Sequence, residues 1–161
     1  MPYDITPATE QDAHDLSLLT GALLEEIMEK IGSRVFDFDP MATKTRAAEL
    51  VGRGVYFAFI ARERENGEAV GFLSLYESYA LYTEGAFGTI PELYVRPRYR
   101  SQGIGELLLQ HARAFALSRG WKRLEVTTPP LPQFERTLAF YESNGFEISG
   151  GRKLKSAVRS N

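Results

Sequence analysis

Cysteine is absent from this chain of 161 residues, and histidine occurs only twice. A chain without cysteine forms no disulfide, builds no thiolate metal site and has no cysteine nucleophile. The two histidines, His14 and His111, stand far apart in the sequence and do not predict a metal site. We therefore expect no bound metal, and the lack of thiols suits a reducing compartment.

Long hydrophobic runs are also missing from the sequence. No apolar stretch reaches the roughly 18 residues that a membrane-spanning helix needs, so we expect no membrane partner. The first residues, Met1 to Asp4, lack the basic start and the apolar stretch of a signal peptide. We accordingly expect a cytoplasmic location.

The composition is that of an ordinary globular protein. Hydrophobic residues make up 43% of the chain and charged residues 25%, values that fit neither a disordered, nor a collagen-like, nor a coiled-coil sequence. Because domains most often contain about 100–150 residues, we expect one domain that spans residues 1–161.

Charge is distributed unevenly along the chain. Residues 1–95 contain 7 Lys or Arg and 16 Asp or Glu, whereas residues 96–161 contain 12 and 5. This asymmetry favours a cationic ligand on the first part and an anionic ligand on the second. The isoelectric point of about 5.8 argues against a nucleic-acid partner.

The hydrophobic pattern alternates between helical and extended segments. Helical spacing predicts helices over residues 10–31, 41–52, 103–119 and 133–144. Extended patterns predict strands over 3–6, 55–61, 69–76, 89–95 and 122–127, and a last strand pair near 146–148 and 152–154. This order predicts a single α/β (α+β) domain with a mixed, mostly antiparallel central sheet of six to seven strands, flanked on both faces by about four helices.

The segment after the fourth of these strands has the features of a phosphate site. A strand runs into a turn with Gly103 and Gly105 and then into a helix, whose first amides are free to bind an anion. Three arginines stand immediately upstream, namely Arg96, Arg98 and Arg100. The third glycine of a dinucleotide-binding fingerprint and the Walker P-loop are both absent, so neither of those ligands is indicated.

Three motifs in this region resemble those of one known family. Arg100-Ser101-Gln102-Gly103-Ile104-Gly105 resembles the R/Q-x-x-G-x-G/A acetyl-CoA signature of the GNAT superfamily of N-acetyltransferases. Glu92-Leu93-Tyr94-Val95-Arg96-Pro97 resembles the strand before that signature, and Phe140-Tyr141-Glu142-Ser143-Asn144-Gly145-Phe146 resembles a later element of the family. The resemblance implies the GNAT fold and acetyl-CoA as co-substrate.

The resemblance also implies a role for individual residues. Main-chain amides after Arg100 would hold the pyrophosphate, and the main chain of Leu93 and Val95 would pair with the pantetheine arm. A bulge in this strand would point an amide at the thioester carbonyl, and we expect Tyr94 to provide it. The cofactor-binding set predicted in this way is Leu93, Tyr94, Val95, Arg100, Ser101, Gln102, Gly103, Ile104, Gly105, Glu106, Phe134 and Tyr141. Phe134 stands where family members often have asparagine.

The reaction that the resemblance implies needs a base and an acid. An amine must lose a proton before it attacks a thioester, and a carboxylate can accept that proton directly or through water. Glu92 is our first choice for the base because it lies on the strand beside the expected thioester, with Glu77 and Glu84 as alternatives. Tyr141 matches the family's general acid, which protonates the leaving thiolate.

The acceptor is the least determined part of the prediction. By resemblance, the first helices and the segment after Tyr76 shape the acceptor pocket, and these segments carry Glu25, Glu26, Glu29, Glu77 and Glu84. Such carboxylates, together with nearby aromatic residues, favour a small cationic, polyamine-like amine. Two alternatives stay open, acetylation of a protein N-terminus or lysine, and a non-catalytic acyl-CoA-binding regulatory domain. A homodimer is compatible with the resemblance.

Overall fold

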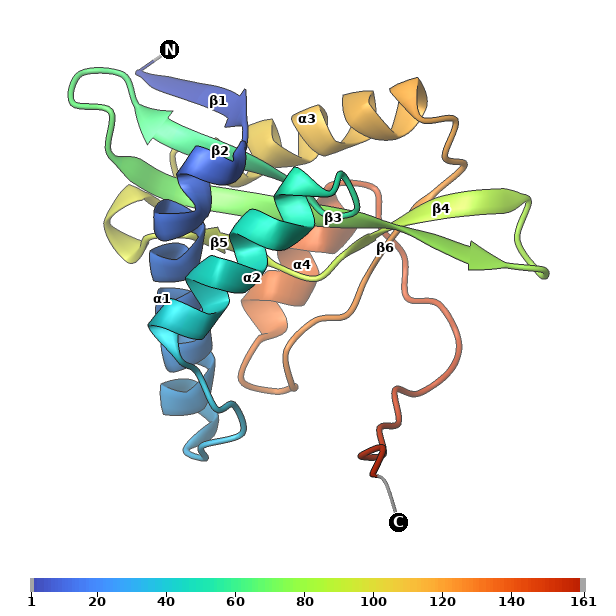
Figure 1. Ribbon diagram of the computed structural model, residues 1–161. Coiled ribbons are helices and arrows are strands. Elements are labelled where there is room, and N and C mark those ends of the chain that lie inside the picture. Colours follow the sequence, from blue (N-terminus) through green and yellow to red (C-terminus); the bar gives the residue numbers. More distant parts are fainter. Residues whose placement is uncertain (1, 160–161) are drawn as a thin grey trace.

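The computed structural model describes residues 2–159, so Met1, Ser160 and Asn161, which the domain prediction includes, lie outside the described residues. The α-helices of this range are α1 (Ala13–Ile31), α2 (Pro40–Gly52), α3 (Ile104–Ser118) and α4 (Glu135–Ser143). The strands are β1 (Tyr3–Pro7), β2 (Phe57–Glu63), β3 (Ala69–Ala80), β4 (Gly85–Ile90), β5 (Leu93–Val95) and β6 (Leu124–Val126). Short 3₁₀ turns, η1 (Glu10–Asp12) and η2 (Pro97–Tyr99), precede α1 and α3 (Figure 1).

The strands form one mixed sheet in the order β1-β2-β3-β4-β6, with β5 also paired to β3. Every pairing is antiparallel except that of β4 with β6, which is parallel. The crossover from β5 through α3 to β6 supplies this parallel neighbour, as a strand–helix–strand unit does. The predicted fold class, a mixed and mostly antiparallel sheet with helices on both faces, is thereby confirmed.

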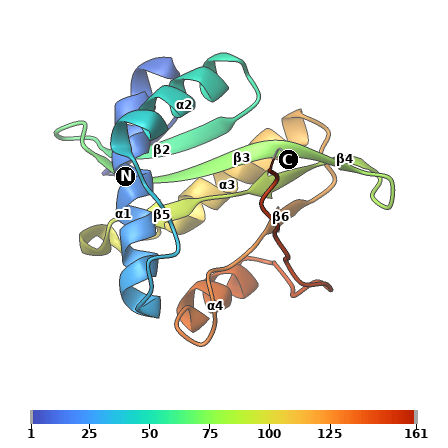
Figure 2. The ribbon, with the colours of Figure 1, turned by 60° about the horizontal axis from the view of Figure 1, so that its bottom comes forward.

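Helices cover both faces of the sheet. α1 and α2 lie on one face, whereas α3 and α4 lie on the other (Figure 2). Strand alternation explains the two cores: Phe59 and Ala61 pack in the cluster under α3, while Ala58 and Ile60 pack in the cluster under α1. Burial of apolar side chains on both sides therefore fixes the register of the central strands.

Local sequence signals set the helix ends. α1 ends at Gly32, whose φ of 70° lies in the left-handed region that glycine adopts without strain. α2 begins at Pro40, and the Asp39 carboxylate accepts hydrogen bonds from the amides of Met41 and Ala42 at 3.0 and 3.2 Å. These signals define where α1 ends and where α2 begins.

The sheet divides at Pro91 and Glu92. β3 pairs with β5 along its first half and with β4 along its second half. On its other side β4 pairs with β6 only as far as Ile90 and Val126. Beyond that point the chain turns away towards α4, and β5 has β3 as its one partner among the described strands (Figure 2). The sheet therefore opens between β5 and the segment that follows β6.

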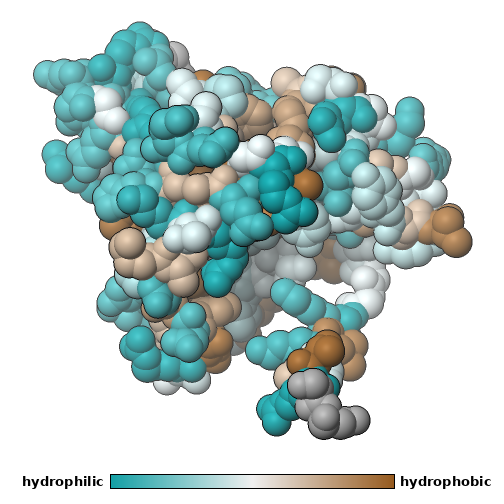
Figure 3. All heavy atoms as spheres, in the orientation of Figure 1, coloured by the Kyte–Doolittle hydropathy of each residue, from teal (hydrophilic) through white to brown (hydrophobic). Residues whose placement is uncertain are grey.

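Two regions differ from the sequence-based expectation. Residues 77–88, most of which the predicted strands leave out, extend the β3–β4 hairpin beyond the body of the molecule (Figure 3). Leu81 in its turn is fully exposed. The last strand pair near 146–148 and 152–154 is not formed in the described residues. After Phe146 the chain instead stands away from the body (Figure 1). Its apolar residues Ile148 and Leu154 are exposed.

Candidate active site

The turn into α3 presents a row of free amides. Gly103 caps the helix with a φ of 81°, and Ser101 also has a positive φ, of 64°. In the described chain the backbone amides of residues 101–106 donate to no backbone carbonyl, because the first intrahelical bond runs from Leu107 to Gly103. A Cβ on Gly103 would meet nothing within 4 Å. The turn is therefore open to an anion, and the helix dipole adds to its positive potential.

Side chains of β1 and β2 form hydrogen bonds with this turn and with η2, which precedes it. The hydroxyl of Tyr3 donates a hydrogen bond to the side-chain carbonyl of Gln102. Tyr3 also packs edge-on against Tyr99 with ring centroids 6.2 Å apart, and the Tyr99 hydroxyl donates to Glu63 at 3.1 Å. Both tyrosines are buried. The backbone of the turn is thus already ordered, which lowers the entropy cost of binding.

Arg100 is tied to its surroundings by two directed hydrogen bonds. Its Nε donates to the carbonyl of Val95 at 2.8 Å, and its Nη2 donates to the Glu26 carboxylate on α1, also at 2.8 Å. The guanidinium lies 5.5 Å from the centroid of the Tyr94 ring. Arg96 likewise donates to a backbone carbonyl, that of Ala69, at 3.3 Å. The geometry makes Arg100 an anchor between α1, β5 and the turn.

The free edge of β5 offers backbone groups to a partner. Arg96 and Glu92 bond to β3 through the amide of Arg96 and the carbonyl of Glu92. Because antiparallel residues alternate, Tyr94 also faces β3, opposite Phe72, and only Leu93 and Val95 face outward. The N–H of Tyr94 therefore points at β3 and not at the free edge, contrary to the expectation that it faces the thioester, whereas the N–H of Leu93 points to the free edge.

Tyr141 lies on α4 within the core under α3. Its ring packs against Phe140 and Phe146 at centroid distances of 5.5 and 5.3 Å. Burial raises the pKa of the Tyr141 phenol well above its ordinary value. The phenol is therefore protonated at neutral pH, as a proton donor must be. Phe140 in turn lies against Gly105, so α4 meets α3 at the free amides.

Glu92 stands at the point where the sheet opens, and two hydroxyls hold its carboxylate. Ser74, which is fully buried, donates to Glu92 Oε1 at 2.5 Å, and the Tyr56 hydroxyl donates to the same oxygen. The Glu92 amide donates back to Ser74 Oγ at 3.1 Å. Sequence reasoning did not include Tyr56 or Ser74, although a serine within the apolar run of β3 is a signal of a buried polar contact.

The two alternative carboxylates lie elsewhere. Glu77 accepts a hydrogen bond from the indole of Trp121 at 2.7 Å and another from the Tyr79 hydroxyl, so it supports the projecting hairpin. Those bonds lower the pKa of Glu77 below its ordinary value, which weakens it as a base. Glu84 is exposed in the turn between β3 and β4. Of the three candidate carboxylates, Glu92 is the one that lies where the sheet opens.

Comparison with known proteins now places the chain in a family. Residues 55–148 match the family model described as an acetyltransferase (GNAT) domain. The chain belongs to the GNAT family.

Two relatives and one solved structure illustrate the similarity. An uncharacterised N-acetyltransferase of Bacillus subtilis (strain 168) is 34% identical over 87 residues, and this match covers 54% of the chain and 57% of the relative. The aminoalkylphosphonate N-acetyltransferase of Salmonella typhimurium is 37% identical over 112 residues, 68% of each protein. An aminoglycoside N-acetyltransferase in complex with CoA has the same fold, with a TM-score of 0.77 and 17% identity over 98% of this chain and 95% of the other.

The GNAT domain places its candidate base and acid on opposite faces of the sheet. Ser74 and Phe72 share the face covered by α1, so the Glu92 carboxylate, bonded to Ser74, lies on that face. Tyr141 belongs to the core cluster of the other face, together with residues of α3. The opening between β5 and the segment after β6 connects these two faces of the sheet.

Phe134 begins α4 of the GNAT domain and is buried. Lys30, near the end of α1, places its ammonium 5.0 Å from the centroid of the Phe134 ring. The proline-rich segment before it, residues 129–132, contains neither a helix nor a strand, because proline suits neither. An aromatic ring at this position has no amide group with which to bind the pantetheine arm, so any contact from Phe134 is apolar.

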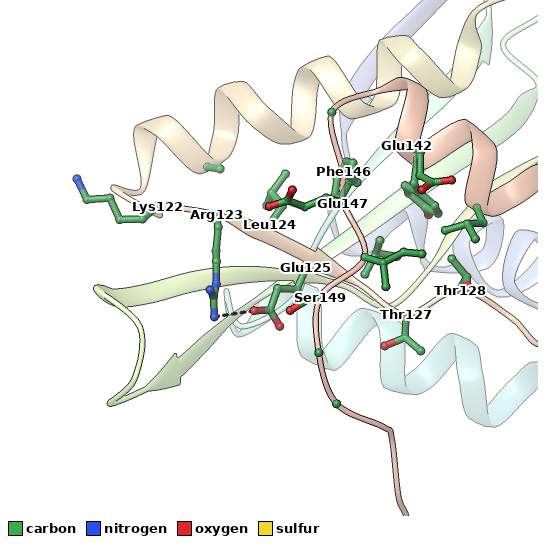
Figure 4. A pocket seen from close by; sticks show the side chains of 18 of the residues that line it. Lys122, Arg123, Leu124, Glu125, Thr127, Thr128, Glu142, Phe146, Glu147 and Ser149 are labelled. Carbon is green, nitrogen blue, oxygen red and sulfur yellow. Dashed lines mark ion pairs between the residues drawn. The ribbon is translucent and has the colours of Figure 1, made fainter.

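A groove of the GNAT domain lies beside β6 and has a volume of about 1240 Å³. β6, α4 and the segment after Phe146 line it, and an ion pair of 2.8 Å joins Arg123 to Glu125 at its rim (Figure 4). Tyr141 reaches this groove, but the turn at residues 100–106 does not. The groove is thus separate from the row of free amides.

Two further classes of site are not indicated. The described residues contain no group of three or more His, Cys, Asp or Glu side chains that could hold a metal ion. None of the helices in residues 2–159 is both long and apolar enough to cross a membrane.

Proposed function

We propose that this GNAT domain transfers the acetyl group of acetyl-CoA directly to a primary amine of a small molecule. The observation that carries the proposal is the juxtaposition of two backbone features, the free amides of residues 101–106 and the outward edge of β5. The first fits a diphosphate and the second fits the amide-bearing pantetheine arm. Acetyl-CoA supplies the acetyl group as a thioester.

Different residues of the chain bind the diphosphate, bind the pantetheine arm and stabilise the thioester oxygen. Main-chain amides from Ser101 to Glu106 hold the diphosphate, and Leu93 and Val95 bind the extended arm. Val95 contributes its amide alone, because Arg100 occupies its carbonyl. The Leu93 amide points into the opening and can donate to the thioester oxygen, where negative charge develops during attack. Arg100, Tyr94 and Phe134 shape the walls of this site.

Proton transfers are assigned to Glu92 and Tyr141. The free oxygen of Glu92 accepts the proton of the attacking amine, directly or through water, from the α1 face. The Tyr141 phenol donates a proton to the sulfur that leaves on the opposite face. No group of the chain becomes acylated, which suits a protein that has no cysteine.

A small amine is the acceptor that we favour. The acidic residues that suggested a polyamine are dispersed: Glu26 pairs with Arg100, Glu77 pairs with Trp121, and Glu84 lies on the projecting hairpin. Figure 1 shows α1 and the end of this hairpin on opposite sides of the molecule. Relatives named for aminoalkylphosphonate and aminoglycoside acetylation make those two classes the first to compare with polyamines.

Release of free CoA thiol tests the proposal. The full chain is incubated with acetyl-CoA and a panel of aminoalkylphosphonates, aminoglycosides, polyamines, amino acids and peptides. Turnover with one small-amine class, dependent on Tyr141, is the expected result. Turnover with peptides alone would identify a protein acetyltransferase. Tight acetyl-CoA binding without turnover of any amine would indicate an acyl-CoA-binding domain and overturn the proposal.

A further inference from the structure

Tyr56 and Ser74 both donate hydrogen bonds to the carboxylate of Glu92, the candidate base. Tyr56 directly precedes β2, Ser74 lies in β3 and Glu92 lies between β4 and β5, so three separate segments meet at one carboxylate. Both hydroxyls donate to Oε1, while Oε2 has no hydrogen-bond partner in residues 2–159. One oxygen is thus fixed and the other is left for a ligand.

Ser74 makes most of the hydrogen bonds of this cluster. Ser74 Oγ accepts the Glu92 amide at 3.1 Å and donates to the carboxylate at 2.5 Å, and the Ser74 amide donates to the Glu92 carbonyl at 3.0 Å. Ser74 is completely buried, so its hydroxyl has no solvent alternative. A buried serine that makes this many bonds to one residue fixes both the backbone and the side chain of that residue.

Tyr56 contributes a donor that stays protonated. Burial, and then the neighbouring charge of Glu92, raise the pKa of Tyr56 well above its ordinary value. The other titratable group near this hydroxyl is Tyr76, on the same face of β3 as Ser74. Tyr56 therefore donates to the carboxylate throughout the pH range in which an acetyltransferase is assayed.

We propose that Tyr56 and Ser74 are positioning residues that form a two-hydroxyl clamp, which fixes Oε1 of Glu92 and directs Oε2 at the acceptor amine. Two donors on Oε1 leave the other oxygen of the carboxylate to accept the proton of the amine. They also limit the side chain to one orientation, which keeps the accepting oxygen in line with the amine. The catalytic role of the clamp rests on the proposed function. The hydrogen bonds from Tyr56 and Ser74 to Glu92 do not depend on that function.

The test combines a spectrum that needs no turnover with steady-state kinetics. Carbon-13 labelling of glutamate carboxyl groups gives a resonance for Glu92, identified by its loss in Glu92→Gln. In Tyr56→Phe and in Ser74→Ala this resonance should move at neutral pH, because the carboxylate loses a hydrogen-bond donor. Tyr82→Phe, at the exposed hairpin turn, is the matched control and should cause no shift.

The kinetic readout separates positioning from general structure. In Tyr56→Phe kcat for the amine should fall about tenfold, because the base loses its orientation, whereas acetyl-CoA affinity should stay within about twofold. An unchanged Glu92 resonance in both variants would overturn the clamp even if the enzyme is active. A shifted resonance with an unchanged kcat would instead remove Glu92 from the proposed mechanism and, with it, the catalytic role of the clamp.

Discussion

Gly105 on α3 and Phe140 on α4 approach so closely that a Cβ on Gly105 would lie 2.9 Å from Cζ of the phenyl ring. The second glycine of the G-x-G signature therefore has a packing role in addition to any contact with phosphate. Because Phe140 precedes Tyr141, the same contact sets the distance between the free amides of α3 and the proposed acid. A change at this contact should therefore alter both the position of the amides and that of Tyr141.

Gly105→Ala should destabilise the protein by about 1 kcal/mol and lower kcat about tenfold. Overpacking costs about 1–3 kcal/mol, and the better helix propensity of alanine offsets at most about 1 kcal/mol of that. Urea denaturation measures the change. In a Phe140→Leu background the approaching ring atoms are gone, so the same substitution should become neutral or stabilising. Gly150→Ala, where a Cβ would meet nothing within 4 Å, is the control. A loss of stability equal in both backgrounds would contradict this packing role.

Local patterns were enough to predict most elements of this fold. The leucine and isoleucine spacing of residues 10–31 predicts α1, and the structure divides that segment only into η1 and an α-helix. The turn from β5 into α3 could also be located, because glycines and arginines beside a helix start have a direct chemical meaning. These features depend on residues that are close together in the sequence.

The remaining features depend on contacts across the chain. Glu92 is 18 residues from Ser74 and 36 from Tyr56, and no local pattern pairs them. The direction of the Tyr94 amide follows from which residues of β5 face β3, and a one-residue change in that register would reverse it. The segment after Phe146 has strand-like residues but pairs with no strand in the described chain, since a strand forms only where a partner supplies hydrogen bonds.

Tyr141→Phe should lower kcat about 100-fold and leave acetyl-CoA affinity within about threefold. The substitution removes the proton donor but keeps the ring that packs between Phe140 and Phe146. Steady-state kinetics and calorimetry measure the two effects. Tyr82→Phe, which alters an exposed phenol, should change neither. Equal turnover of Tyr141→Phe and the unaltered protein at neutral pH would exclude Tyr141 as the acid.

The raised pKa of Tyr141 also predicts a pH dependence. The phenol titrates at 10.0 when unperturbed, and burial raises its pKa further. The neutral form is thus favoured in the folded state, so the contribution to stability is complete below about pH 10 and is lost as the pH rises above it. Thermal unfolding at increasing alkaline pH should show this loss, and Tyr141→Phe should lose less stability over the same range. An identical alkaline loss in Tyr141→Phe would assign the effect to other tyrosines.

Gly103→Val should weaken acetyl-CoA binding at least tenfold. A branched side chain is strained at a φ of 81° and would project into the space in front of the free amides. Gly120→Val is a matched control, because Gly120 has a φ of 74°, also meets nothing within 4 Å, and follows the far end of α3. Both variants should lose about 1–2 kcal/mol of stability from backbone strain, but only the first should lose affinity in calorimetry. Retained binding in Gly103→Val would place the diphosphate elsewhere.

Glu26→Gln distinguishes the two roles that Arg100 could have. If the guanidinium were a free phosphate ligand, removal of the competing Glu26 carboxylate would raise acetyl-CoA affinity. The observed bonds to Val95 and Glu26 make Arg100 an anchor of the turn instead. Glu26→Gln should therefore lower acetyl-CoA affinity about two- to fivefold. This factor corresponds to the loss of a partly exposed ion pair that contributes about 0.5–1 kcal/mol.

Arg100→Lys completes the same test. Lysine keeps the positive charge but lacks the planar group that donates to Val95 and Glu26 together. Arg100→Lys should therefore weaken acetyl-CoA binding as much as Arg100→Gln, about tenfold, with little dependence on salt concentration. Calorimetry at low and high salt measures both. The opposite result would be that Arg100→Lys keeps its affinity at low salt and loses it at high salt. In that case the charge of residue 100 would act on the phosphates, and its directed hydrogen bonds would be dispensable.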